Sequence, residues 1–196
     1  VEEAGRAPTE YKTAFAKFPS SVCAPADAIV YPAACTRLDY EGELGVVIGE
    51  RCRNVPVSAA RTVIAGYLNV NDVSARDWQS RTSQWTLGKS FDTFTPIGPA
   101  LVSADEVPDP QHMDLVVRVN GEVRQNSNTS EMIFTIEQLI SELSSVCTLL
   151  PGDIIATGTP AGVGISFTPE RLLGVGDEVA VHVAGLGVLR NTVVSA

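Results

Sequence analysis

The sequence of 196 residues has few basic residues and no long apolar run. Its 14 Lys and Arg stand against 23 Asp and Glu, which gives a formal net charge of −9. This balance argues against nucleic acid as a partner, because phosphate binding requires clustered basic side chains. The longest apolar stretches are interrupted by Gly or His and fall well short of the roughly 20 residues that span a bilayer. We therefore expect no membrane segment and a small-molecule substrate.

Cysteine and histidine are also scarce, with four Cys and two His in the chain. The cysteines form no C-x-x-C pair and have no His at zinc-ligand spacing, which argues against a structural zinc site. No segment resembles a signal peptide, so we expect free thiols and a cytoplasmic protein, although the even number of cysteines leaves a disulfide open. The chain begins at Val1 rather than Met, which suggests that the gene product extends further upstream.

Length and the 44% hydrophobic content predict one domain with a single core. Residues 1–30 are rich in Ala, Pro, Ser and charge and lack periodicity, so we expect a loop or lid there. The folded domain is expected over 31–196, with order beginning near Leu38.

Periodicity within that domain predicts mostly strands. Residues 44–48 form a β-rich apolar run, and Asn120-Gly121 after a valine-rich stretch predicts a hairpin. One clear helix is expected from Ile136, where apolar residues recur at helical spacing after a Thr135–Gln138 capping box. The predicted fold class is therefore strand-rich α+β.

Glu41 and Glu43 lie two residues apart on an expected strand, which places both carboxylates on one face. Gly42 between them is expected to leave room for a ligand. Like charges at this spacing repel, so the pair is either solvated at an edge or bound to a cation. Because it leads directly into an apolar strand, where unpaired charge is costly, we favour the cation.

Asp72 is the third acidic candidate. If a helix begins near Asp72, then Asp72, Arg76 and Gln79 share one face. The alternative is that Asp72 only caps that helix. With the two glutamates it offers a site of three carboxylates, and oxygen ligands of this kind favour Mg²⁺, Mn²⁺ or Ca²⁺ over Zn²⁺.

Lys89 and the loop 158–164 complete the candidate residues. Lys89 lies among apolar and aromatic residues, where it either packs its aliphatic stem or, near a metal, stabilises an anion or transfers a proton. The glycine-rich loop lacks the Gly-Lys-Ser/Thr ending of a phosphate loop, so nucleotide binding is not expected. It can still bring backbone N–H groups and Thr159 close to a ligand, or be a plain turn.

Five stretches together resemble the fumarylacetoacetate hydrolase family. They are DYEGELGVVIG (39–49), GYLNVNDVSARD (66–77), GKSFDTF (88–94), VNGE (119–122) and PGDIIATGTPAGVG (151–164). They cover almost the whole chain in the family's order. The resemblance implies the catalytic domain of that family, a mixed β-roll that is usually dimeric.

The resemblance also implies a role for each candidate residue. Mg²⁺ or Mn²⁺ is expected on Glu41, Glu43 and Asp72. The positions of Arg76, Gln79, Lys89 and Thr159 match those that hold the 2-oxo acid end of the substrate, with Gln79 and Lys89 also acting at the reacting centre.

One departure concerns the His–Glu dyad that family hydrolases often carry, in which the Glu lies three residues after the His. Here Val1-Glu2-Glu3 fits the end of that motif, so Glu3 is the expected base and the His falls before Val1. His112 and His182 do not replace it, since one lies in an expected surface turn and the other on an expected strand.

The reaction that the resemblance implies is cleavage of a C–C bond in a 1,3-diketo acid, such as an acylpyruvate or fumarylpyruvate, with a pyruvate enolate as intermediate. The same enolate arises in oxaloacetate decarboxylation, and a related one in isomerisation of 2-hydroxyhepta-2,4-diene-1,7-dioate. A catalytically inactive metal-binding paralogue is the alternative of a different class.

Overall fold

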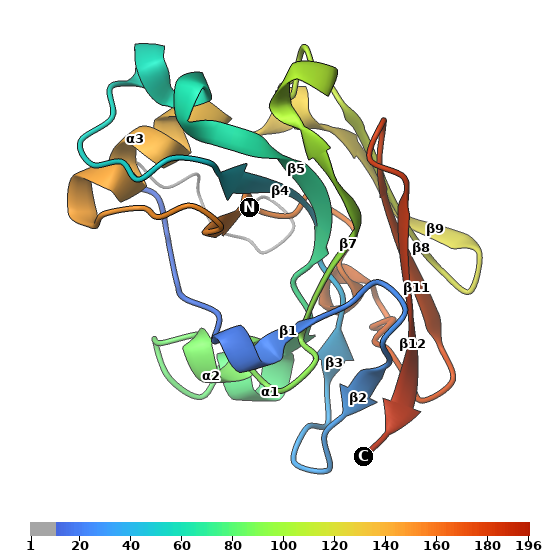
Figure 1. The fold of residues 1–196 in the computed structure, drawn as a ribbon. Helices are drawn as coiled ribbons and strands as arrows, with labels where there is room; N and C mark the ends of the chain where they lie inside the picture. Colours follow the sequence, from blue (N-terminus) through green and yellow to red (C-terminus); the bar gives the residue numbers. More distant parts are fainter. Residues whose placement is uncertain (1–10) are drawn as a thin grey trace.

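The computed structural model describes residues 11–196, which form two five-stranded sheets packed face to face (Figure 1). The first sheet has the order β1 (Val22–Cys23), β7 (Thr95–Ser103), β5 (Ile64–Asn71), β4 (Gly42–Ile48) and β10 (Ile154–Ala156). The second has the order β2 (Ile29–Tyr31), β12 (Val188–Ser195), β11 (Glu178–Val183), β8 (Asp114–Val119) and β9 (Glu122–Asn128). The short strands β3 (Leu38–Asp39) and β6 (Ser74–Ala75) pair with each other.

The helices are few and short. They are α1 (Arg76–Gln79), α2 (Thr86–Lys89) and α3 (Ile136–Val146), with 3₁₀ turns at Pro19–Ser21, Val57–Val63, Ala104–Glu106, Thr129–Glu131 and Gly164–Ser166. The strand-rich α+β class predicted from the sequence is confirmed. Within residues 11–196, no helix is both long and apolar enough to cross a membrane.

The main core lies between the two sheets, because the strands of both sheets contribute their buried aliphatic side chains to it. β4 is buried along its whole length. A methyl group added at Gly42 would stand 2.2 Å from Val117 Cγ2 on β8. The expectation that Gly42 leaves room for a ligand is therefore wrong: the second sheet fills that space, and the glycine permits the close approach.

Two local predictions are confirmed. Asn120 and Gly121 both have positive φ, 51° and 82°, and join β8 to β9 as a hairpin. The helix α3 begins with the expected capping box between Thr135 and Gln138 and ends before Cys147.

Two predictions are corrected. No helix begins at Asp72, because the chain continues into β6 and α1 starts only at Arg76, with Ala75 as its N-cap. Order also begins before Leu38, since β1 and β2 fall within the segment expected to be loop. Parallel pairing with β7 and β12 and the complete burial of Ile29 anchor that stretch. Backbone pairing with strands far along the chain leaves no local pattern, which explains the error.

Candidate active site

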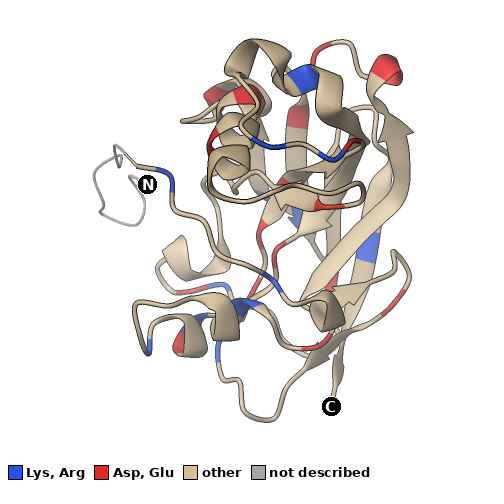
Figure 2. Ribbon diagram, turned by 60° about the vertical axis from the view of Figure 1, so that its left-hand side comes forward, with Lys and Arg blue, Asp and Glu red and all other residues tan. Residues whose placement is uncertain are grey.

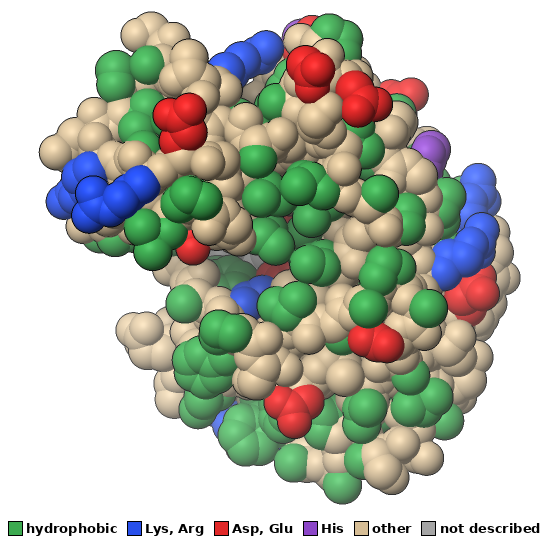
Figure 3. All heavy atoms as spheres, in the orientation of Figure 1, with side chains coloured by type: hydrophobic (Ala, Val, Ile, Leu, Met, Phe, Trp, Pro, Cys, Tyr) green, Lys and Arg blue, Asp and Glu red, His purple; other side chains and the backbone are tan. Residues whose placement is uncertain are grey.

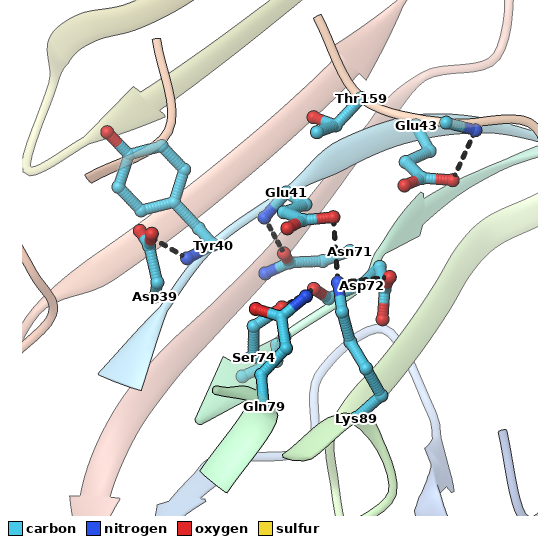
Figure 4. Close-up of polar contacts among 12 residues, drawn as sticks. Asp39, Tyr40, Glu41, Glu43, Asn71, Asp72, Ser74, Gln79, Lys89 and Thr159 are labelled. Carbon is cyan, nitrogen blue, oxygen red and sulfur yellow. Dashed lines mark hydrogen bonds and ion pairs between the residues drawn. The ribbon is translucent and has the colours of Figure 1, made fainter. Parts of the chain in front are cut away.

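Strand pairing brings the three acidic candidates together at one end of the first sheet. Glu41 and Glu43 flank the start of β4, which pairs with β5 so that Gly42 faces Asn71. Asp72 follows β5 directly, and its N–H donates to the carbonyl oxygen of Glu41 at 2.8 Å. One oxygen from each of the three carboxylates lies within 4.8 Å of the others, and all three residues are buried. Figure 4 shows the carboxylates converging from these two adjacent strands.

Lys89, the last residue of α2, places its ammonium between two of these carboxylates. Its Nζ lies 2.7 Å from Asp72 Oδ2 and 2.9 Å from Glu41 Oε2 (Figure 4). The side chain is among the most buried in the protein, with 1% of its surface exposed. A lysine is rarely buried so fully unless it is paired, which these two contacts provide. The alternative that Lys89 only packs its stem against apolar neighbours is therefore not what the structure shows.

Arg76 supplies the second buried cation. Its Nη1 donates to Glu41 Oε1 at 2.5 Å and to Gln79 Oε1 at 2.9 Å, and its Nε donates to Asp39 Oδ2 at 2.8 Å. The remaining nitrogen, Nη2, is buried and has no hydrogen-bond partner among residues 11–196. A buried guanidinium donor without a partner costs free energy, so it is available to a ligand that brings an anionic oxygen.

Asp39 is a residue of this site that the sequence reasoning missed. It is fully buried on β3 and, besides Arg76, accepts from the backbone N–H groups of Gly164 at 2.7 Å and Ile165 at 3.0 Å. It thus fixes both Arg76 and the end of the glycine-rich loop. Its position two residues before Glu41 was the available signal, since it repeats the spacing of Glu41 and Glu43.

The glycine-rich loop lies over the start of β4. The N–H of Gly158 donates to Glu43 Oε2 at 2.8 Å, and the hydroxyl of Thr159 donates to the carbonyl of Gly42 at 3.0 Å. Gln125 on β9 donates to the same hydroxyl at 2.8 Å. The loop therefore brings an N–H and Thr159 to the acidic cluster.

The two glutamates have opposite electrostatic surroundings. Burial by itself would raise the pKa of Glu41, but Lys89 and Arg76 lower it overall. Burial raises the pKa of Glu43 to about 8, with Asp72 and Glu41 adding to the rise and Lys89 opposing it. Burial also disfavours the charged form of Lys89, yet Glu41 and Asp72 raise its pKa overall. Within residues 11–196, the positively charged side chains therefore contact Glu41 and not Glu43.

Lys17 is a further cation at the site that was not predicted. Its ammonium contacts Asp72 Oδ1 and the carbonyl oxygen of Lys89. Both oxygens of Asp72 consequently accept from lysine ammonium groups. Nothing in the sequence around Lys17 marked it, because its partners lie more than 50 residues further along the chain.

Glu3, the predicted base, falls outside the described residues. His112 is exposed and contacts Asp109 at 2.8 Å. His182 lies on β11 and lines a small groove on the second sheet with Arg118 and Arg190, so neither histidine reaches the acidic cluster.

Comparison with known proteins identifies relatives of this chain. The model of the fumarylacetoacetate (FAA) hydrolase C-terminal domain matches residues 1–194. A Burkholderia lata relative, provisionally named a hydrolase, is 50% identical over 187 residues, which cover 94% of this chain and 66% of the relative. The chain therefore spans slightly less than two thirds of that relative's length.

Two solved structures show the same fold. The 2-hydroxyhepta-2,4-diene-1,7-dioate isomerase of Mycobacterium marinum is 42% identical with a TM-score of 0.85, over 91% of this chain and 67% of that one. The fumarylacetoacetate hydrolase of Exiguobacterium antarcticum is 42% identical with a TM-score of 0.90, over 93% of this chain and 66% of that one. These relatives are named as an isomerase and a hydrolase, which supports an enzyme here.

Proposed function

Because the chain belongs to the fumarylacetoacetate hydrolase family, we propose that it is a Mg²⁺-dependent enzyme that hydrolyses a C–C bond in a 1,3-diketo acid such as an acylpyruvate. The observation that carries this proposal is the buried group of Glu41, Glu43 and Asp72, with Lys89 paired to two of its members. Charged side chains are assembled inside a protein at considerable cost, and such assemblies are typical of functional sites.

The residues fit a divalent cation. Three carboxylate oxygens are hard ligands that suit Mg²⁺, with Mn²⁺ or Ca²⁺ as alternatives, and they leave coordination positions for substrate. Burial raises the pKa of Glu43, and the carboxylates of Asp72 and Glu41 add to the rise, so a cation at this carboxylate would stabilise its charged form. When bound, the cation would act as a Lewis acid toward the 2-oxo acid and the negative charge that develops on it.

The acid end of the substrate would be held by residues around Arg76. The partnerless Nη2 offers a charge-assisted hydrogen bond to a substrate carboxylate. Gln79 is fixed next to it by the hydrogen bond from Nη1, and Thr159 faces the cluster from the glycine-rich loop. These groups would orient the substrate, because positions held by buried hydrogen bonds are already set before the substrate arrives.

Lys89 would stabilise the charge that forms when the C–C bond breaks. Water adds its hydroxyl to the distal carbonyl carbon, the C–C electron pair passes to the pyruvate part as an enolate, and that enolate then takes up a proton on carbon. An ammonium held next to two carboxylates by short contacts is already oriented for a developing negative charge. Glu3, together with a histidine preceding Val1, is the proposed base that activates the water.

Two alternative reactions use the same groups without a hydrolytic water. The isomerase name of the Mycobacterium marinum relative favours tautomerisation of a 2-hydroxydienoate, and decarboxylation of oxaloacetate also ends in an enolate. An inactive metal-binding paralogue would keep the carboxylate group and lack turnover. We further propose that the protein is a cytoplasmic homodimer, which sedimentation equilibrium tests.

Turnover assays separate these functions. The purified protein is tested on acylpyruvates, oxaloacetate and a 2-hydroxydienoate, each with Mg²⁺ and with a chelator. We expect Mg²⁺-dependent release of pyruvate from an acylpyruvate. Faster decarboxylation or isomerisation would select one of the alternatives, and no turnover with retained Mg²⁺ binding would support the inactive paralogue.

The substitution Glu3→Ala tests the hydrolytic step within one protein. It should abolish most acylpyruvate hydrolysis and spare oxaloacetate decarboxylation, because only the first reaction needs an activated water. General misfolding would reduce both rates. Equal losses, or none in either reaction, would remove Glu3 from the role of base.

A further inference from the structure

Residues 11–18, which we name the strap, cross the mouth of the acidic site. The strap runs from the neighbourhood of α3 down to the short helices α1 and α2 (Figures 1 and 2). Lys12 pairs with Glu142 on α3, and Phe15 contacts Trp85 edge-on with ring centroids 5.7 Å apart. Figure 3 shows a hollow on this face between the part that contains α3 and the part that contains α1 and α2, with charged side chains at its bottom.

The strap reaches the bottom of the site through Lys17. The side chain of Lys17 is 11% exposed and that of Asp72, its partner, is 2% exposed. Phe15, two residues earlier, lies over the other ammonium of the site, with its ring centroid 5.2 Å from Lys89 Nζ. The strap therefore covers the site with an aromatic ring and inserts a positive charge into it.

Lys17 and Lys89 together place two positive charges on one carboxylate. Asp72 is also one of the three proposed ligands of the divalent cation. A divalent cation at the three carboxylates adds two more positive charges at short range, where burial limits screening by solvent. Lys17 is the only one of these groups carried by the strap.

We propose that Lys17 is a latch: it ties the strap to Asp72 and opposes the binding of a divalent cation at Glu41, Glu43 and Asp72. This inference rests on the cation site of the proposed function. Coupling between two events is reciprocal. If closure of the strap weakens cation binding, then cation binding loosens the strap by the same factor.

Calorimetric Mg²⁺ titration tests the first half of this coupling. Lys17→Met keeps most of the aliphatic stem and removes the charge. We expect it to bind Mg²⁺ roughly tenfold or more tightly than the wild type, because a unit charge has been removed at contact distance. Lys17→Arg, which keeps the charge, should bind like the wild type.

Lys12→Met is the matched control. It removes the other lysine ion pair of the strap, in which Lys12 is 20% and Glu142 41% exposed, and a partly exposed pair of this kind contributes little. Its Mg²⁺ affinity should stay within about twofold of the wild type, as expected for a change away from the site. Circular dichroism and melting curves of all three variants establish that they are folded.

Hydrogen exchange of the strap amides tests the second half. In the wild type, Mg²⁺ should increase exchange over residues 11–18. In Lys17→Met the exchange should be fast with or without Mg²⁺, and in Lys12→Met the response to Mg²⁺ should persist.

The possible failures are distinct. Unchanged or weaker Mg²⁺ binding by Lys17→Met, with normal binding by the wild type, would overturn the latch and leave the cation site intact. Slower strap exchange on adding Mg²⁺ would overturn it too. A wild type that binds no Mg²⁺ would overturn both the latch and the proposed cation site.

Discussion

Glu41 and Glu43 are two residues apart and both are buried, yet their carboxylates have different partners. Glu41 accepts from Arg76 at 2.5 Å and contacts Lys89 at 2.9 Å. Glu43 accepts only the N–H of Gly158, at 2.8 Å, among the contacts resolved for its carboxylate in residues 11–196. The pKa of Glu41 is accordingly lowered, whereas that of Glu43 is raised to about 8.

This difference indicates where the site lacks positive charge. At the Glu41 end, Arg76 and Lys89 form ion pairs with the buried carboxylates. At the Glu43 end, a buried carboxylate lies next to two others, and within residues 11–196 no basic side chain is in direct contact with it. A divalent cation would supply the positive charge at that end. Removal of this cation should affect the two glutamates in opposite ways.

The largest expected effect is on stability when Glu41 loses its charge. Glu41→Gln leaves Arg76 and Lys89 buried without their shared partner, and breaking a buried pair in this way costs about 3–5 kcal/mol. Glu43→Gln should cost far less, because it removes a charge that its surroundings disfavour. Urea denaturation of both variants in a chelator measures the difference.

If the two variants had a comparable free energy of unfolding, the difference between the surroundings of Glu41 and Glu43 would not hold. So would a Glu43→Gln variant that is the less stable of the two, since that would place the supporting cations beside Glu43. The matched change of glutamate to glutamine keeps size and shape constant between the two measurements.

Replacement of Lys89 should raise the activation free energy of the reaction, by somewhat less than Glu41→Gln lowers the free energy of unfolding. Lys89→Ala is expected to lower kcat by about 100- to 1000-fold, as for other groups that stabilise a developing anion. KM should change little, because the contribution arises mainly in the transition state. Steady-state kinetics on the substrate found by the turnover assays tests this, and a change confined to KM would assign Lys89 to substrate binding instead.

The pH dependence of stability should reveal the raised pKa of Glu43. Its folded pKa of about 8 lies above the ordinary value of 4.5, so the folded protein keeps a proton that the unfolded chain releases. Stability from this group is therefore present below pH 4.5 and is lost as the pH rises toward 8. Melting curves in a chelator should show that decline in the wild type and not in Glu43→Gln. Identical pH profiles would exclude the raised pKa.

Local patterns predicted the parts of the fold that depend on local chemistry. Asn120-Gly121 specifies its turn because both residues adopt positive φ, and Thr135 with Gln138 specifies a helix start. The helix predicted to begin near Asp72 was wrong, since an Asp before an Arg at helical spacing also occurs after a strand. There the pairing of β3 with β6, not propensity, keeps the chain extended.

The site residues that lie within short sequence motifs could be predicted. The spacing of Glu41 and Glu43 and the family resemblance named the acidic group, which strand pairing then assembles. Asp39 and Lys17 were missed because their partners lie far along the chain. Asp39 acts through backbone N–H groups 125 and 126 residues away, and Lys17 through Asp72, 55 residues away, so no local pattern carries either contact.

Calorimetric Mg²⁺ titration of the wild type and of Glu43→Gln tests whether Glu41, Glu43 and Asp72 hold a divalent cation. We expect saturable binding by the wild type at one site per chain and loss of most of that affinity in Glu43→Gln, because one charged ligand of three is removed. The variant should remain folded by circular dichroism. Unchanged Mg²⁺ affinity in a folded Glu43→Gln variant would contradict the claim.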